Sequence, residues 1–478
     1  MTMLPTEFAP AFPETVLGLG ICLVLLVDLY LPARWRDVTY LLALVTLAAT
    51  AMAVSDIGLS GTTLALGGSF VADPLASFLK LFVLAALATV FVYSRAYLQD
   101  STYNKGEYYL LGLFAALGIL VMISGASLLT LYLGLEMQAL ALYAMVAFNR
   151  DSPVAAEAAM KYFVLGAIAS GCLLYGISLL YGVTGTVQLA EIAQALRAGG
   201  ADDAVTLVAV AFVVVGIAFK FGAVPFHMWV PDVYEGAPVS VTLLVGTVPK
   251  VGAFALALRV LVEGLGETGV TWEPMLGVLA VLSLGIGNIV AIVQTNLRRM
   301  LAYSTIAHVG FILLGFAAGS REGIEAALFY TIVYVIMAAG AFGIVILLGR
   351  QGDDADELDD LRGLSQRSPW FALVMLLLMV SMIGVPPLAG FYAKWWVLAA
   401  LLDAGQLWLA IAGVLFSVVG AFYYLRVVKL MYFDSPAGEA PLRQGAALRL
   451  TLSVNGLLVL ALGVFPEGLI ELCARALG

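Results

Sequence analysis

The chain has 478 residues, of which 62% are hydrophobic and only 12% are charged. A water-soluble core cannot hide this much apolar surface, so the composition excludes an ordinary soluble enzyme and indicates an integral membrane protein. The formal net charge of −9 says little about soluble partners, because acidic residues of such a chain lie mostly in loops. We expect a lipid bilayer, and no nucleic acid, around the chain.

Apolar segments follow one another along nearly the whole chain. A helix needs about 20 apolar residues to cross a hydrocarbon core about 30 Å thick, and about fourteen segments meet this length. No segment predicts a strand, and nothing near the N-terminus has the features of a removable signal peptide. We therefore predict an all-α polytopic membrane protein, one integral domain over 1–478, with helices near residues 14–32, 39–55, 74–94, 107–123, 127–148, 158–182, 204–225, 238–260, 274–295, 302–318, 324–349, 370–400, 407–432 and 448–466.

Positive charge and cysteine usage add two expectations. Most of the 23 Lys and Arg residues fall in alternate loops, and positive residues of short loops stay on the cytoplasmic side. This asymmetry predicts that both termini lie on the non-cytoplasmic side. The three cysteines, Cys22, Cys172 and Cys473, are scattered in apolar segments, so they offer neither disulfide pairing nor cluster-ligand spacing, and we expect no metal site.

Five lysines lie inside the predicted spans: Lys80, Lys161, Lys220, Lys250 and Lys394. An ammonium in hydrocarbon costs about 2.5–3.5 kcal/mol on insertion scales, so a chain that keeps several of them is expected to use them to handle charge. Lys80 lies near the outer end of its span, from where it is expected to snorkel to the interface and to be structural.

Two similar Gly/Pro segments interrupt apolar spans that also carry a lysine. One reads GAVPFHMWVP from Gly222 and the other reads GVPPLAGFYAK from Gly384. Proline removes a backbone donor and glycine loosens a helix, so both helices are predicted to be broken. Irregular backbone at membrane depth must be covered by protein or line a wet cavity, which favours two polar half-channels over proline kinks used only for packing. The residues of the breaks are Gly222, Pro225, Gly384, Pro386 and Pro387.

The two broken segments are the seventh and twelfth spans, and because their offset of five is odd they run in opposite directions. This is typical of inverted repeats, here two five-helix repeats formed by helices 4–8 and 9–13. The predicted division is a three-helix part at 1–106, a first repeat at 107–260, a second repeat at 273–432, and a last helix at 447–478.

Glu136 is the only acid well inside spans four to six. A carboxylate there is expected to neutralise or to find a cation, and the sequence leaves open whether that cation is Lys220 or Lys161. His227 and His308 are the only histidines. A group that titrates near neutrality can relay protons, although a lone histidine in a membrane can equally be a hydrogen-bonded packing residue.

Three motifs carry a family resemblance. They are KFGAVPFHMWVPDVYEGAPVSVTLLVGTVPK at 220–250, RRMLAYSTIAHVGF at 298–311 and GVPPLAGFYAKWW at 384–396. Together with Glu136, they resemble the antiporter-like membrane subunits of respiratory complex I over essentially the whole chain. More narrowly, PFHMWVPDVYEGAP is similar to the version in chain N of the bacterial NADH:quinone oxidoreductase, called subunit 2 in mitochondria.

The resemblance implies fourteen helices with broken helices 7 and 12, and proton translocation coupled to quinone reduction in other subunits. It implies a translocase subunit of the bacterial cytoplasmic (inner) membrane without a redox centre of its own. NADH, FMN, iron–sulfur clusters and quinone would be bound by other subunits. The implied partners are the other membrane subunits of the complex, including a homologous antiporter-like subunit and small membrane subunits.

The resemblance also implies roles for individual residues. Glu136 and Lys220 would form a coupling ion pair, Lys250 would be the central connecting lysine, and Lys394 would belong to the other half-channel. Lys161, His227 and His308 would support the relay. The alternative is a subunit of a multi-subunit sodium/proton antiporter, which shares the lysines and the broken helices; the segment VYEGAP and Lys394 favour complex I. A passive membrane scaffold would not need the buried lysines.

Overall fold

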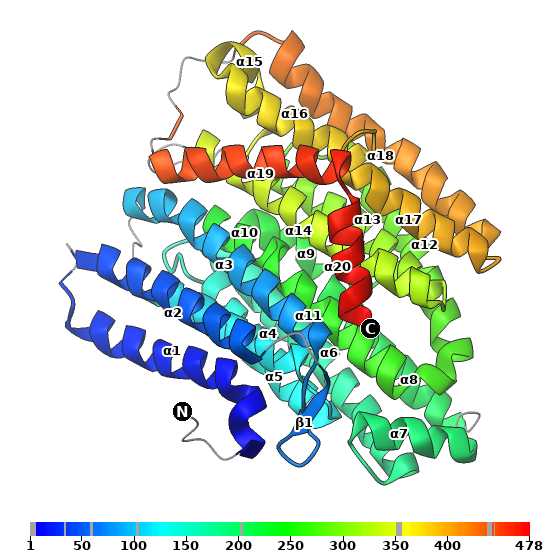
Figure 1. Cartoon of the computed structure of the whole chain (residues 1–478). Coiled ribbons are helices and arrows are strands. Elements are labelled where there is room, and N and C mark those ends of the chain that lie inside the picture. The colour runs from blue at the N-terminus through cyan, green and yellow to red at the C-terminus, as the bar shows by residue number, and fades with distance from the viewer. Residues whose placement is uncertain are drawn as a thin grey trace.

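A computed structural model describes residues 6–32, 35–57, 61–101, 105–200, 204–349, 356–436, 442–443 and 445–478. Nearly all of this described chain is helical (Figure 1), and twelve of its helices are long and apolar enough to cross a membrane. Each predicted span overlaps one of these helices or a shorter one, except that the span at 370–400 overlaps two shorter helices, Pro369–Ile383 and Ala389–Asp403. The all-α polytopic prediction is confirmed. The count of fourteen crossings stays a prediction, because two of the apolar helices have fewer than 18 residues.

The N-terminal part contains three long helices and one element that the sequence analysis did not expect. A two-stranded antiparallel hairpin lies before the third helix, with Thr63 opposite Ala72. The expectation of no strand was wrong because this hairpin is only three residues long on each side and follows no long apolar pattern. The elements are η1 (Thr6–Ala11), α1 (Phe12–Tyr30), α2 (Arg36–Ile57), β1 (Thr63–Ala65), β2 (Phe70–Ala72) and α3 (Pro74–Asp100).

The middle of the chain continues as helices joined by short turns. Serines at the starts of α5 and α6 cap them: the hydroxyls of Ser127 and Ser152 each accept the backbone N–H three residues further on. The elements are α4 (Glu107–Ile123), α5 (Leu128–Val146), α6 (Pro153–Thr184), α7 (Leu189–Ala195), η3 (Leu196–Gly200), α8 (Ala204–Phe221), α9 (Trp229–Gly236), α10 (Val239–Gly246), α11 (Val248–Ala257), η4 (Leu258–Gly264) and η5 (Gly266–Thr268).

The last part of the chain is built in the same way. Asn296 and Ser320 cap α13 and α14 by accepting the N–H groups of Arg299 and Gly323. The elements are α12 (Gly269–Val293), α13 (Leu297–Ala317), α14 (Arg321–Leu348), η6 (Leu358–Leu361), α15 (Leu364–Arg367), α16 (Pro369–Ile383), α17 (Ala389–Asp403), α18 (Leu407–Phe433), α19 (Ala446–Val464) and α20 (Glu467–Leu477).

The core of the molecule is formed by three spans that other helices surround. In the span α10–α11–η4 every residue of the apolar stretch is buried, and in α13 and α14 the buried share of this stretch is 94%. In the span that contains α1 the buried share is only 28%. Figure 1 places α1–α3 on one flank and α16 and α18 on the opposite flank, with α10, α11 and α14 between them. Lys250 and His308 lie on these central helices, and both side chains are buried.

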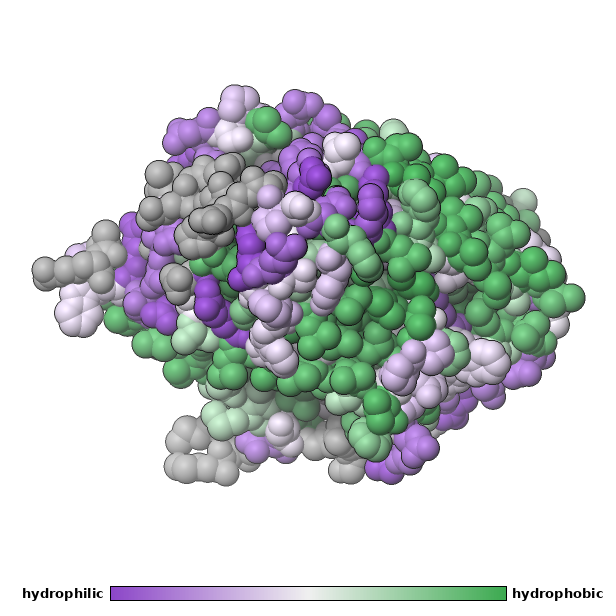
Figure 2. All heavy atoms as spheres, turned by 90° about the horizontal axis from the view of Figure 1, so that it is seen from above, coloured by the Kyte–Doolittle hydropathy of each residue, from purple (hydrophilic) through white to green (hydrophobic). Residues whose placement is uncertain are grey.

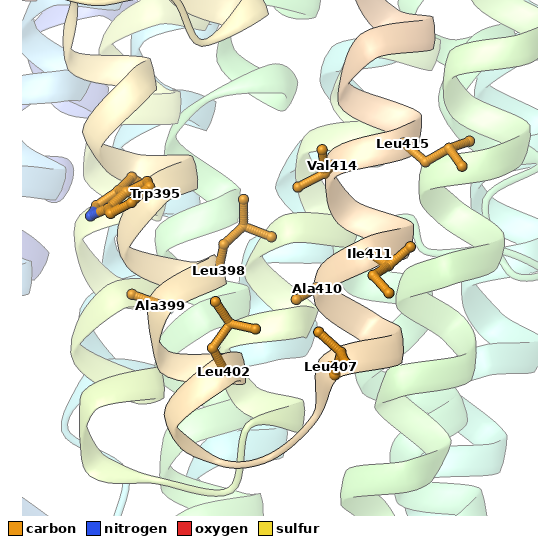
Figure 3. Close-up of a pocket in the computed structure, with 9 residues that line it drawn as sticks. All are labelled: Trp395, Leu398, Ala399, Leu402, Leu407, Ala410, Ile411, Val414 and Leu415. Carbon is orange, nitrogen blue, oxygen red and sulfur yellow. The ribbon is translucent and has the colours of Figure 1, made fainter.

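The outer surface is largely apolar, as a membrane protein requires. Figure 2 shows a broad hydrophobic area, with the hydrophilic residues gathered mainly toward its margins. An apolar groove lies on this outer surface between α17 and α18 (Figure 3). Trp395 and Ile411 on its two walls are both more than half exposed, which fits a surface that faces hydrocarbon chains.

Candidate functional site

The seventh predicted span is broken where the sequence predicted it. The first half, α8, ends at Phe221, and Gly222 follows in the left-handed region with φ +78°. The N–H of Ala223 donates to the Ala218 carbonyl over 2.8 Å, a bond that closes the helix end. The next helix, α9, begins only at Trp229, and Pro225 and His227 lie in the turns between the two halves.

The twelfth predicted span is broken by the same backbone arrangement. Its first half, α16, ends at Ile383, and Gly384 is left-handed with φ +90°. The N–H of Val385 donates to the Val380 carbonyl over 3.3 Å, the same five-residue spacing as at the first break. Helix α17 then begins at Ala389, so Pro386 and Pro387 lie in the turn. The prediction of two broken helices is confirmed.

A third break was missed by the sequence analysis. Helix α10 ends at Gly246 and α11 begins at Val248, with Thr247 between them at φ −121°, ψ −86°. The available signal was Pro249, because proline disfavours helical geometry in the residue before it and is common in the first turn of a helix. This break lies directly before Lys250 and sets the start of its helix.

Two lysines bind the carbonyl ends of the two broken helices. The Lys250 ammonium donates to the Phe221 carbonyl over 2.8 Å, and the Lys394 ammonium donates to the Ile383 carbonyl over the same distance. Phe221 and Ile383 are the last residues of α8 and α16. The carboxyl end of a helix carries partial negative charge, so each helix end can hold an ammonium. Among the residues that the structure describes, neither lysine forms an ion pair with a carboxylate. Lys394 also donates to the Ser417 hydroxyl over 2.8 Å.

The lysine at the first break is not the one that the sequence suggested. Lys220 precedes Phe221 and is partly buried, but Lys250 of the next span contacts the broken end, while it also lies 5.5 Å from the ring centre of Trp229. The sequence shows which lysine belongs to the same span as a break. Which lysine contacts the broken helix end depends instead on how the helices pack. Lys394, in contrast, contacts the break of its own span, as the sequence suggested.

The carboxylate of Glu136 is held by a neighbouring helix. It accepts a hydrogen bond from the Ser170 hydroxyl of α6. In the part of the chain that the structure describes, Glu136 and Lys220 form no ion pair. The ion pair of Glu136 and Lys220 that the resemblance implies is therefore not formed in this structure, and the roles of both residues stay predictions.

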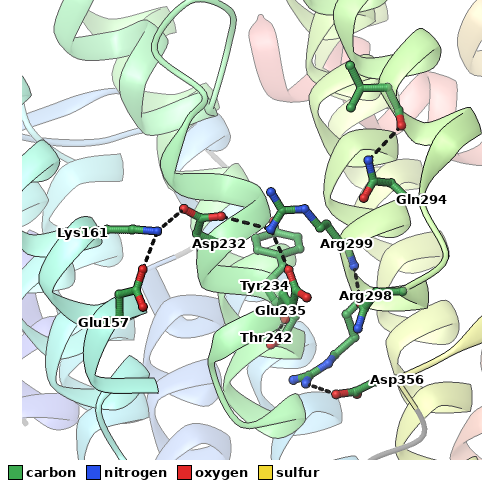
Figure 4. Close-up of polar contacts among 12 residues, drawn as sticks. Glu157, Lys161, Asp232, Tyr234, Glu235, Thr242, Gln294, Arg298, Arg299 and Asp356 are labelled. Atoms are coloured by element: carbon green, nitrogen blue, oxygen red, sulfur yellow. Dashed lines mark hydrogen bonds and ion pairs between the residues drawn. The ribbon is translucent and has the colours of Figure 1, made fainter. Parts of the chain in front are cut away.

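Lys161 belongs to a separate network of ions, shown in Figure 4, so it is not the partner of Glu136. Its ammonium lies 2.8 Å from carboxylate oxygens of both Glu157 and Asp232. Asp232 also pairs over 3.0 Å with Arg299, which lies 2.6 Å from Glu235. Asp232 and Glu235 come from the PDVYEG segment of α9. The network thus attaches the second half of the broken helix to α6 on one side and to α13 on the other.

His308 is a buried residue of α13 that lies near the second break. The ring is 4% exposed, and both nitrogens bond to phenol hydroxyls, Nδ1 to Tyr330 over 2.8 Å and Nε2 to Tyr424 over 3.0 Å. A small cavity is lined by both His308 and Lys394. Tyr334, beside the His308 ring, donates to the Gly246 carbonyl at the third break.

The tyrosines around His308 were missed by the sequence analysis. Tyr330 and Tyr334 recur at helical spacing on α14, and Tyr423 and Tyr424 are adjacent on α18. Such spacing is equally typical of ordinary packing, so the sequence alone could not separate these tyrosines from the others. His227 lies in the turn of the first break, on a different segment from His308.

The expectation that Lys80 snorkels to the interface was wrong. The side chain is only 3% exposed, and its ammonium lies 2.6 Å from Glu14 of α1, which is 8% exposed. A buried charge is stabilised when it is paired with an opposite charge, and Glu14 provides this partner for Lys80 inside the protein. Among the described residues, no group of three or more His, Cys, Asp and Glu side chains is placed to hold a metal ion.

Comparison with known proteins places this geometry in a family. Residues 125–420 match the family described as NADH:quinone oxidoreductase/Mrp antiporter, transmembrane. The NADH-quinone oxidoreductase subunit N of Thioalkalivibrio sulfidiphilus is 57% identical over 479 residues and covers 100% of both chains. The subunit of the same name from Thiobacillus denitrificans is 56% identical, with 99% of this chain and 98% of that protein covered.

Solved structures agree with this match. A chain of respiratory complex I from Thermus thermophilus with bound aureothin is 31% identical, covers 96% of this chain and 98% of its own length, and superposes with a TM-score of 0.82. A chain of the Mrp complex from Dietzia sp. DQ12-45-1b has a TM-score of 0.81 at 24% identity and covers 98% of this chain and 96% of its own length, which shows a shared fold. The chain therefore belongs to the NADH:quinone oxidoreductase/Mrp antiporter transmembrane family.

Proposed function

We propose that this chain is the proton-translocating subunit N of a bacterial NADH:quinone oxidoreductase. The observation that carries the proposal is the pair of lysines at the two helix breaks: Lys250 and Lys394 donate to helix-end carbonyls, and His308 lines a cavity together with Lys394. Cations are costly in a membrane and mark ion pathways, and full-length relatives carry the name of this subunit. The chain is a translocase subunit that works with the other membrane subunits of the complex.

The proposed relay uses the residues named from the sequence. A conformational or electrostatic signal from a neighbouring subunit changes the separation of Glu136 and Lys220, and the proton then moves by Lys250 and His308 to Lys394. Glu136 bonds to Ser170 and forms no ion pair with Lys220 among the described residues. This supports the step, because a carboxylate that moves toward or away from a lysine changes how strongly the lysine holds its proton. Lys161 and His227 are supporting residues: Lys161 helps fix α9, the half-helix next to the first break.

The proposal includes the wider organisation of the chain. The matching helix ends at Gly222 and Gly384 support two inverted repeats, at 107–260 and 273–432, between the three-helix part at 1–106 and the last helix at 447–478. Both termini lie on the non-cytoplasmic side of the inner membrane. NADH, FMN, the iron–sulfur clusters and quinone are held by other subunits.

The test uses inverted membrane vesicles that contain the assembled complex. Lys250→Met keeps the apolar stem and removes the charge, while Lys429→Met is the matched control on an exposed lysine (68% side-chain exposure). NADH oxidation, proton uptake and sodium-driven proton exchange without NADH are recorded for both variants. We expect Lys250→Met to lose NADH-driven proton uptake and Lys429→Met to behave as wild type. If sodium-driven exchange disappears while both NADH-driven activities persist, the chain is instead a subunit of a sodium/proton antiporter.

A further inference from the structure

His308 is held between two phenol hydroxyls on two other helices. Its Nδ1 bonds to Tyr330 of α14 and its Nε2 bonds to Tyr424 of α18. A neutral imidazole has one N–H donor and one acceptor nitrogen, so one of these hydroxyls receives a hydrogen bond from the ring while the other gives one. A proton that arrives at one ring nitrogen can therefore leave from the other only through one of these tyrosines.

Tyr424 is the tyrosine that faces the second break. It lines the small cavity that His308 and Lys394 share, and Tyr330 does not. The cavity has room for about one water molecule. An ammonium has three N–H donors, and two of those of Lys394 are taken by the Ile383 carbonyl and the Ser417 hydroxyl. Within the described part of the chain the third donor has no acceptor, and Lys394 lines the cavity, so this donor is available to bond within it. The Tyr424 hydroxyl is held in place by Ser304, whose hydroxyl lies 2.5 Å from it.

We propose that the Tyr424 hydroxyl transfers the proton between Lys394 and His308. In one direction, the Lys394 ammonium loses a proton through the cavity to the Tyr424 oxygen, while the O–H of Tyr424 gives its own proton to Nε2 of His308. One N–H and one O–H bond break, one O–H and one N–H bond form, and the phenol ends neutral. The reverse transfer follows the same bonds. This inference rests on the proposed function and adds to it a group that bonds to His308 and lines the same cavity as Lys394.

The chain supplies a matched control beside Tyr424. The ring of Tyr423 lies 4.2 Å from that of Tyr424, centre to centre, and both side chains are buried. The Tyr423 hydroxyl, however, bonds over 3.1 Å to the amide oxygen of Asn288 and not to His308. Removing either hydroxyl takes one oxygen atom from the same cavity wall. Only the loss of the Tyr424 hydroxyl interrupts the path to His308.

The first measurement compares Tyr424→Phe with Tyr423→Phe in inverted vesicles, with proton uptake corrected for the amount of assembled complex. A positioned acid–base group typically contributes 10²–10⁴-fold, so Tyr424→Phe is expected to lower NADH-driven proton uptake by at least about tenfold. Tyr423→Phe is expected to stay within about twofold of wild type. Equal uptake in the two variants would overturn the inference.

The second measurement keeps the hydroxyl and changes only its acidity. A fluorinated, more acidic tyrosine incorporated at position 424 preserves the packing, so it also serves if Tyr424→Phe fails to assemble. A hydroxyl that transfers protons predicts a shift of the pH profile of proton uptake toward lower pH, whereas a hydroxyl that only packs leaves the profile where it is. Lys250→Met, measured in the same membranes, distinguishes failure of this inference from failure of the proposed function. If Lys250→Met abolishes uptake and both Tyr424 changes behave as wild type, this inference fails and the proposed function stands.

Discussion

Removal of the Lys80 ammonium should destabilise the N-terminal helices strongly. Lys80→Met keeps the apolar stem and leaves Glu14 without its cation at a site where the two side chains are 3% and 8% exposed. Breaking a buried ion pair by removing one partner costs about 3–5 kcal/mol, because the remaining charge is uncompensated. The pair joins α1 to α3, so the loss should loosen α1 from the rest of the molecule.

The size of the effect can be bracketed from the geometry. At the observed N–O separation of 2.6 Å and an effective dielectric constant of about 20, Coulomb's law gives an attraction of roughly 6 kcal/mol. Removing both ions from water offsets much of this attraction, so replacing the whole pair by apolar groups is often close to neutral. The double variant Lys80→Met/Glu14→Leu should therefore lie within about 1–2 kcal/mol of wild type, and the two single losses should not add.

The assay is thermal dissociation of the detergent-solubilised complex, followed by size-exclusion chromatography of a fluorescently tagged chain. Lys80→Met and Glu14→Leu should each lower the midpoint temperature, and the double variant should recover most of the loss. Arg95→Met is the control, because its pair with Asp37 of α2 is 37% and 55% exposed and should contribute about 1 kcal/mol or less. Midpoints of the two single variants equal to that of Arg95→Met, or losses that simply add in the double variant, would refute the reasoning.

Two further predictions concern backbone and thiol. Gly222→Ala should lower the stability of the chain by roughly 2–5 kcal/mol, because φ is +78° and the new Cβ would lie 2.5 Å from a Val230 methyl group. Gly171→Ala on α6 is the control: this glycine has open space around it, so the change should raise the stability by up to about 1 kcal/mol. The thermal midpoints of both variants check this, and a stable Gly222→Ala chain would contradict it. Burial raises the pKa of the Cys473 thiol on α20 to about 12, so a water-soluble maleimide at pH 8 should leave it unlabelled. A cysteine placed at the neighbouring exposed Leu472 should react, and equal labelling rates at the two positions would be inconsistent with a buried thiol.

The sequence predicted the helices and the two breaks well because each depends on local chemistry. Apolar length decides a membrane span, and Gly222 and Gly384 end their helices through their own backbone freedom. The site was predicted less completely, because contacts between spans depend on packing. Nothing local in Lys250 shows that it reaches the carbonyl of Phe221, 29 residues earlier in the chain.

Charge partners were the hardest part to predict for the same reason. Lys80 and Glu14 lie on different helices, and the partner of Lys161 proved to be Asp232 and not Glu136. Buried acids and bases are expected to pair. A single sequence contains several of each but does not give their positions in space, so it does not show which acid pairs with which base. The hairpin β1–β2 was missed because three residues per strand carry too little pattern.

The helix-end carbonyls that accept Lys250 and Lys394 belong to the main chain, and this has a consequence for how the protein can vary. Phe221 and Ile383 can exchange their side chains for others of similar size without removing the oxygen that each lysine binds. An acid used as a partner could be lost by one base change, whereas these acceptors cannot be mutated away as long as the chain turns at Gly222 and Gly384. A saturation library should therefore find tolerance at the two accepting residues and intolerance at the two glycines that follow them.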